Sequence, residues 1–260
     1  MSTPSVSVYR RVPAPALQPF VERLLVVEST AARRDVHLPS TGFVAAFGFR
    51  GACLLDGGTP APRSAVTGLW STVRSHAHSG DHAVALVAFT PIGAAAWLHQ
   101  PLEDFADRTC DLDAVLGYRA DLDRLHQRLE SSALHAERLR HVEEFLLRHL
   151  GGRQPDPAIG TVVASIERAQ RALAPVRIAA LARSLGLSQS ALERRFRRQV
   201  GASPRRFASL VRLRHVARLR AEGANLTTIA HATGYSDQPH FCRDFKRFTG
   251  CSPGDFFTAG

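Results

Sequence analysis

Several residue types are scarce in this chain of 260 residues, and each scarcity excludes a class of protein. The four cysteines (Cys53, Cys110, Cys242 and Cys251) are too few and too scattered for a disulfide framework, so we expect free thiols in a reducing compartment. No run of about 18 apolar residues occurs, which excludes a conventional membrane-spanning helix. The first residues lack a basic flank followed by an apolar stretch, so we expect no signal peptide and a cytoplasmic location.

Lysine is nearly absent, but positive charge is not. Only Lys246 accompanies the arginines among the 33 basic residues, and the formal net charge is +10. Residues 171–260 hold 16 basic and 5 acidic side chains, a net charge of +11, whereas residues 1–170 hold 17 and 18, a net charge of −1. All the excess positive charge therefore lies in the C-terminal third, as expected of a segment that neutralises phosphates.

Hydrophobic periodicity divides the chain into a β-rich part and a helical part. Short apolar segments at 42–49, 52–56, 64–69 and 83–90 alternate with Gly, Pro and Asp turns and predict strands. From residue 118 onward the apolar residues recur at helical spacing. We therefore predict an α+β chain with a small β-barrel or sandwich over 1–117 and a helical hairpin over 118–150. A linker at 151–157 and an all-helical domain over 158–260 follow.

The C-terminal domain contains one pattern twice, about 49 residues apart. Ala182 corresponds to Ala230 and Gly186 to Gly234, and each copy ends in Gly-x-Ser-Pro, at 201–204 and 250–253. A small residue on a first helix, a glycine turn and a capped second helix are the requirements of a helix-turn-helix. The pattern predicts two such units, at about 176–201 and 226–250, joined by a continuous helix over about 204–221.

The second helix of each unit has an apolar inner face and a polar outer face. Leu192 with Phe196, and Phe241 with Phe245, are spaced to bury the inner faces, and Ser188 and Asp237 are suitable N-caps. Arginine pairs with guanine, glutamine with adenine and glutamate with cytosine in the major groove of DNA. We therefore predict DNA contacts from the outer faces, which carry Gln189, Ser190, Glu193, Arg194, Arg197 and Arg198 in the first unit, and Gln238, His240, Arg243, Lys246 and Arg247 in the second.

This layout resembles the AraC/XylS family of bacterial transcription regulators over about residues 158–257. The most specific stretch runs from Ile229-Ala230 through Gly234-Tyr235 and Phe245-Lys246 to Ser252-Pro253. The resemblance implies double-stranded DNA as a partner, with base contacts from Ser190, Glu193 and Arg194 in the first unit, and from Gln238, Pro239 and Arg243 in the second. Pro239 departs from the polar residue common there and has no hydrogen-bonding side chain, so Gln238 or His240 takes more of the contact.

The resemblance also implies a cupin-like sensor domain ahead of the DNA-binding domain. A small-molecule effector, RNA polymerase and a second copy of the chain, through the hairpin at 118–150, are the further partners that it implies. Candidate effector-binding residues are Phe47, Trp70, His76, His78 and Trp97, although aromatic packing in a core is the commoner role of such side chains.

His76, His78 and His82 are the one cluster with the composition of a metal site. The segment 75–81 has the composition of a turn and no nearby glutamate completes a ligand set, so we expect exposed loop histidines, no metal and no cofactor.

Two alternatives to an effector-controlled regulator differ in class. One is a regulator that senses no ligand and is controlled by a protein partner. The other is a DNA-repair alkyltransferase with a similar DNA-binding domain. That chemistry needs a reactive cysteine in a Pro-Cys-His setting, which neither Cys53 nor Cys110 has. We therefore expect a transcription regulator and not an enzyme.

Overall fold

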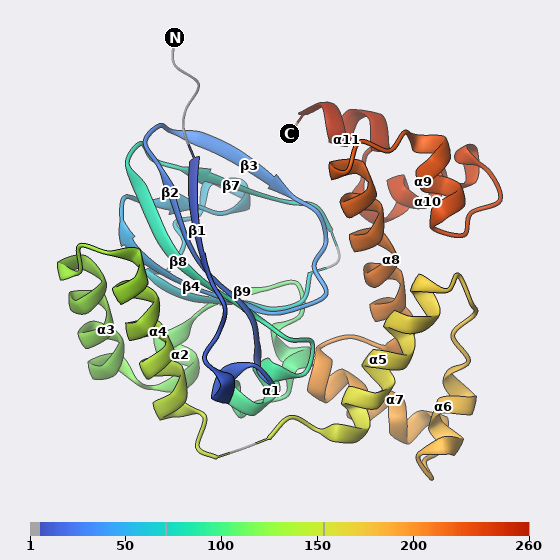
Figure 1. Ribbon diagram of the computed structural model, residues 1–260, viewed down its shortest axis with the longest axis horizontal. Helices are drawn as coiled ribbons and strands as arrows, with labels where there is room; N and C mark the ends of the chain where they lie inside the picture. The colour runs from blue at the N-terminus through green and yellow to red at the C-terminus, as the bar shows by residue number, and fades with distance from the viewer. Residues whose placement is uncertain (1–5, 71, 153, 260) are drawn as a thin grey trace.

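A computed structural model describes residues 6–70, 72–152 and 154–259, and its strands form two antiparallel sheets (Figure 1). The larger sheet has the order β1 (Val6–Arg11), β2 (Val21–Ser29), β8 (His82–Phe89), β4 (Val44–Arg50), β6 (Ser64–Thr67) and β9 (Thr109–Asp111). The smaller has the order β3 (Arg33–His37), β7 (Arg74–His78) and β5 (Cys53–Leu54).

Alternation along the central strands separates the two faces of the larger sheet. On β8, Ala85, Val87 and Phe89 are buried on one face, whereas Val84 and Leu86 are half-buried on the other. Successive side chains of a strand point to opposite faces, so this pattern describes a sheet covered by different layers on its two sides. β4 shows the same alternation, in a segment where the sequence predicted a strand.

Helices cover the fully buried face of the larger sheet. These helices are α1 (Gly93–Leu98), α2 (Leu112–Leu116), α3 (Arg119–Ser131) and α4 (His135–His149). Phe145 of α4 packs edge-on against Phe47 at 5.8 Å and against Trp97 at 6.2 Å between ring centroids. Phe47 and Trp97 are 0% and 1% exposed, so the structure places both in the core, and their assignment to effector binding stays a prediction. Both rings belong to the core between sheet and helices, where they bury a large apolar area.

Two predictions for the N-terminal region need correction. The described strands form two open sheets and no closed barrel, so the sandwich is the correct alternative. The segment predicted as a turn at 75–81 contains most of β7. This strand forms although its side chains are polar, because its backbone pairs with β3 on one edge and with β5 on the other. The polar sequences of β3 and β7 also explain why hydrophobicity alone missed these strands.

The C-terminal region is entirely helical, as predicted. Its helices are α5 (Pro157–Arg171), α6 (Ile178–Ser184), α7 (Gln189–Val200), α8 (Pro204–Ala221), α9 (Leu226–Ala232), α10 (Gln238–Thr249) and α11 (Pro253–Ala259). Figure 1 shows α6 and α7 near one end of α8, and α9 and α10 near the other. At 1.5 Å per residue, α8 is about 27 Å long and separates the two units. Among the described residues, no helix combines the length and the apolarity needed to cross a membrane.

The buried side chains form two cores, and their division falls inside α8. The larger core is continuous from the sheets and α1–α4 through α5 to α7 and the first half of α8. The smaller core consists of Leu213, Val216, Ile229, Ala230, Phe241 and Phe245. The first helix-turn-helix unit therefore shares its core with the N-terminal region, and the second has a core of its own. The predicted linker at 151–157 includes Arg153, which lies outside the described residues, and the domain boundaries remain predictions.

Candidate nucleic-acid interface and effector cavity

The first helix-turn-helix unit has the local geometry that its sequence predicted. Ala182 of α6 is 1% exposed, which lets α7 pack closely across it. Gly186 makes the turn with φ of +68°, a conformation that side-chain-bearing residues rarely adopt. The Ser188 hydroxyl accepts a hydrogen bond from the backbone N–H of Ala191 at 3.2 Å and caps α7. Leu192 and Phe196 are fully buried, as the amphipathic pattern predicted.

The second unit repeats this geometry with an additional polar anchor. Gly234 has φ of +80°, and the Asp237 carboxylate accepts from the backbone N–H of His240 at 2.6 Å to cap α10. The Tyr235 hydroxyl donates to the Asp244 carboxylate at 2.9 Å and fixes the turn against α10. Burial, together with this carboxylate, raises the pKa of Tyr235 to about 12, so the phenol stays protonated and keeps the hydrogen bond.

On α7, five of the six predicted DNA-contacting residues are exposed: Gln189, Ser190, Arg194, Arg197 and Arg198. Glu193 is half-buried and is already engaged, because its carboxylate accepts from Gln189 at 3.0 Å and from Arg197 at 3.4 Å. A contact from Glu193 to cytosine would therefore require these two hydrogen bonds to break. Arg194 and Arg198 make no hydrogen bond or ion pair with any described residue, which leaves both guanidiniums available.

On α10, four of the five predicted residues are exposed: His240, Arg243, Lys246 and Arg247. Gln238 is half-buried, and its side-chain carbonyl accepts from the Thr227 hydroxyl at 2.7 Å. Arg247 forms an ion pair with Asp244 at 2.5 Å. Within the described ranges Arg243 and Lys246 have no such partner, so they are the available cations of the second unit.

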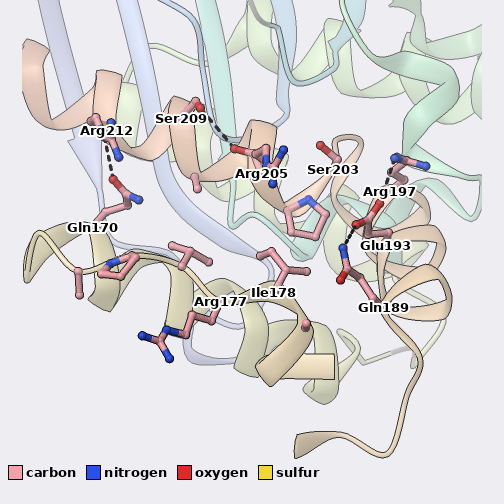
Figure 2. A pocket seen from close by; sticks show the side chains of 16 residues that line it. Gln170, Arg177, Ile178, Gln189, Glu193, Arg197, Ser203, Arg205, Ser209 and Arg212 are labelled. Atoms are coloured by element: carbon pink, nitrogen blue, oxygen red, sulfur yellow. Dashed lines mark hydrogen bonds and ion pairs between the residues drawn. The ribbon is translucent and has the colours of Figure 1, made fainter. Parts of the chain in front are cut away.

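A groove of about 630 Å³ lies between α7, α8 and the segment that precedes α6 (Figure 2). Arg177, Arg197, Arg205 and Arg212 line it, against a single carboxylate from Glu193. Arg212 donates to the side-chain oxygen of Gln170 at 3.1 Å. Four cations facing one anion make the groove electropositive, which suits the phosphate backbone of nucleic acid.

The groove continues along α8 toward the second unit. A second depression is lined by Ser203, Arg205 and Ser209, which also line the groove, together with Arg247 and Phe248 of α10. Arg205 is exposed and lies where the two depressions meet. The sequence predicted α8 as a continuous helix between the two units, but Arg205 and Arg212 were not predicted at the interface, although the arginines of this helix were a usable signal.

A cavity of about 780 Å³ separates the two sheets of the N-terminal region. The larger sheet contributes apolar side chains, among them Val44, Ala46 and Leu86, and the smaller sheet contributes polar ones. Of the predicted effector-binding residues, Trp70, His76 and His78 line this cavity. The sequence analysis missed Arg74 because it assigned no strand there. In a strand, Arg74, His76 and His78 share one face.

His76 and His78 are half-buried and His82 is buried, so the predicted cluster does not consist of loop histidines exposed to solvent. His78 and His82 lie 4.4 Å apart between ring centroids, and His37 and His76 lie 5.0 Å apart. Burial, with a smaller effect from neighbouring histidines, lowers the pKa of His76 and of His82 to about 4, so both rings are neutral at physiological pH. Across the described segments, no three His, Cys, Asp or Glu side chains are arranged to hold a metal ion.

Trp70 connects the cavity to the helical region. Its indole N–H donates to the carbonyl of Leu38 at 3.1 Å, and its own carbonyl accepts from the backbone N–H of Ser40 at 3.2 Å. Leu38 packs against the smaller core of the second unit, and Arg214 of α8 donates to the Thr41 hydroxyl at 3.2 Å. The segment 38–41 is therefore in contact with both the cavity wall and the helices of the DNA-binding region.

Comparison with known proteins finds matches to two parts of the chain. Residues 181–259 match a family described as a helix-turn-helix domain, and residues 9–111 match a domain of unknown function (DUF6597). A putative AraC-like transcription regulator of Streptomyces lividans is 34% identical over 127 residues, which cover 47% of this chain and 39% of that protein. Over the matched segments the chain is similar to AraC-like transcription regulators.

A second relative matches a smaller share of the chain. The HTH-type transcriptional activator RhaS of Escherichia coli K12 is 38% identical over 79 residues, 29% of this chain and 28% of RhaS. These matched segments span well under half of either relative. Among solved structures, ToxT from Vibrio cholerae aligns over 98% of both chains with a TM-score of 0.46 and 11% identity. The Streptomyces protein and RhaS are named as a transcription regulator and a transcriptional activator. Burial also raises the pKa of Cys53, the reverse of what a nucleophilic thiol requires.

Proposed function

We propose that this chain is a sequence-specific DNA-binding transcription regulator whose DNA affinity is modulated by a small molecule bound between its two sheets. The observation that carries the proposal is the pair of helix-turn-helix units whose exposed second helices adjoin a continuous electropositive groove. One such unit inserts its second helix into one segment of the major groove. Two units separated by α8 suit two segments of one duplex.

The available cations divide into two roles by position. Arg194 and Arg243 lie in the first half of the second helices, where side chains reach base edges, and their guanidiniums suit guanine. Arg205 lies on α8 between the units, where the duplex backbone would pass. We assign Arg194 and Arg243 to base recognition and Arg205 to phosphate contact.

Modulation rests on the contacts of Trp70. A molecule in the cavity would touch the ring of Trp70, whose two hydrogen bonds hold the segment 38–41 against α8 and the smaller core. A shift of this segment changes how the second unit is held relative to the first. Since both units must engage one duplex together, such a shift alters DNA affinity.

The direct test is a titration of labelled DNA from the region upstream of the coding sequence, followed by fluorescence anisotropy with excess nonspecific competitor. We expect Arg194→Ala and Arg243→Ala each to cost about 1–3 kcal/mol of binding free energy and to relax base preference at one position. Arg205→Ala should weaken all sequences about equally and reduce the salt slope by about 1. Arg10→Ala, an exposed arginine on β1, is the matched control. Binding that competitor abolishes at every salt concentration contradicts the proposal.

A regulator without a ligand, controlled by a protein partner, is the competing hypothesis, and the cavity with its link through Trp70 favours the effector-controlled form. RNA polymerase and a second copy of the chain remain predicted partners.

A further inference from the structure

The floor and the roof of the cavity between the sheets differ in chemistry. The floor is the half-buried face of the larger sheet, with Val27, Val44, Ala46, Val84 and Leu86. The roof is the smaller sheet, with polar and charged side chains from β3 and β7. A ligand that fits both surfaces has an apolar body and a polar group at one side.

Charge in the lining is almost fully paired. Four arginines line the cavity, and three of them have carboxylate partners: Arg33 pairs with Asp35, Arg63 with Glu130, and Arg50 with Glu28 and Asp81. The fourth, Arg74, forms no ion pair with any carboxylate of the described residues. A partly buried cation without a counter-charge is unfavourable unless another group compensates it.

The surroundings of Arg74 are preorganised without neutralising it. Its guanidinium donates to the Thr109 hydroxyl at 3.1 Å, and the Thr109 and Thr67 hydroxyls lie 3.0 Å apart. It also lies 5.9 Å from the centroid of the Trp70 ring. Thr109 belongs to the larger sheet and Arg74 to the smaller one, so this contact joins the two sheets at the cavity and holds the guanidinium in a defined position.

The neighbouring histidines do not change the charge of the cavity lining. Because burial keeps His76 and His82 neutral, they add hydrogen-bonding groups and no positive charge. Asp56 interacts with Arg74 electrostatically, but it forms no ion pair with it and accepts hydrogen bonds from the backbone N–H and the hydroxyl of Ser75 at 2.7 Å and 2.8 Å. Arg74 is therefore the one arginine of the described lining that forms no ion pair.

We propose that the cavity binds a small organic monoacid, with its carboxylate on the guanidinium of Arg74 beside the ring of Trp70 and its apolar body against Val44, Ala46 and Leu86. This inference deepens the effector-binding part of the proposed function and rests on it. The volume of about 780 Å³ lies within the range of pockets that hold drug-sized ligands. A carboxylate on arginine forms charge-assisted hydrogen bonds, frequently two in parallel.

The test compares matched probes on the full chain by calorimetry. Octanoate, phenylacetate and 1-naphthoate are titrated beside octanamide, phenylacetamide and 1-naphthamide, which keep the apolar body and lose the charge. We expect at least one acid to bind roughly 10- to 100-fold more tightly than its amide. Arg74→Gln should remove this preference, and Arg74→Lys should restore part of it.

Arg63→Gln is the matched control, because Arg63 lines the same cavity but is paired with Glu130. It should leave the preference for acids within about twofold of the native chain. Ala46→Phe, which fills the apolar floor, should weaken acids and amides alike.

The proposal is overturned if no acid of the panel binds, if amides bind as well as acids, or if Arg74→Gln keeps the full preference for acids. DNA titration without any probe reports on the proposed DNA binding separately. A chain that binds DNA but no acid therefore refutes only the ligand class, whereas a chain that binds an acid but no specific DNA refutes the regulator.

Discussion

Removal of one phenylalanine ring should unfold the second helix-turn-helix unit while the rest of the chain stays folded. Phe245 is 2% exposed, and its ring centroid lies 5.7 Å from that of Phe241, 5.9 Å from that of Phe256 and 5.7 Å from that of Phe257. Truncation of a buried phenylalanine to alanine costs about 3–5 kcal/mol. A unit of about 45 residues has only about 2–7 kcal/mol of stability, so Phe245→Ala takes away most of it.

The matched variant is Phe196→Ala. Phe196 is 0% exposed and occupies the corresponding position in the first unit, but it belongs to the large core shared with the sheets. The same loss of about 3–5 kcal/mol should therefore lower the stability of the whole shared core. Hydrogen exchange read by mass spectrometry distinguishes the two results, because it reports opening segment by segment.

In Phe245→Ala we expect fast exchange over about residues 213–257 and native protection in the sheets. Specific DNA affinity should fall by at least roughly 100-fold, since the base contacts of one unit are lost. Uniform loss of protection across the chain in Phe245→Ala would refute the independence of the smaller core. Unchanged specific DNA affinity with the second unit unfolded would refute the use of both units on one duplex.

Three further predictions concern stability. His126 is 3% exposed and contacts the Ser64 hydroxyl at 2.7 Å, and burial with a smaller effect of Arg63 lowers its pKa to about 4. Because the folded state holds this ring neutral, its contribution is complete above pH 6.5 and is lost as the pH falls from 6.5 toward 4. The loss amounts to at most about 3 kcal/mol in urea titrations. His126→Asn should flatten that slope, and an unchanged slope would contradict the assignment. Gly93→Ala should cost about 3 kcal/mol or more, because a Cβ there would overlap the carbonyl of Phe20, whereas Gly80→Ala, with ordinary contacts, should cost little in the same assay. Ser188→Ala removes the cap of α7 and should cost about 1 kcal/mol, seen as faster exchange of the Ala191 amide; native protection there would contradict the cap.

Local sequence rules predicted the C-terminal half well. The caps at Ser188 and Asp237, the turns at Gly186 and Gly234 and the full length of α8 depend on contacts within a few residues of one another. Helical periodicity, caps and positive φ at glycine are properties of the local chain, so they can be read without knowledge of the fold. The N-terminal half was predicted less well, because the partners of β3 and β7 are strands far away in sequence and their own residues are polar.

By itself, the sequence determined the duplicated helical unit, the location of the positive charge and the resemblance to AraC-like regulators, because each is written in short-range spacing or in composition. Only the tertiary structure decided which aromatic rings are core and which line the cavity, since Phe47, Trp97 and Trp70 are indistinguishable until the faces of the sheet are known. It also decided that Glu193 is engaged while Arg74 forms no ion pair with a carboxylate of the described residues. Pairing of charges depends on which distant strands and helices meet, and that is a property of packing and not of local sequence.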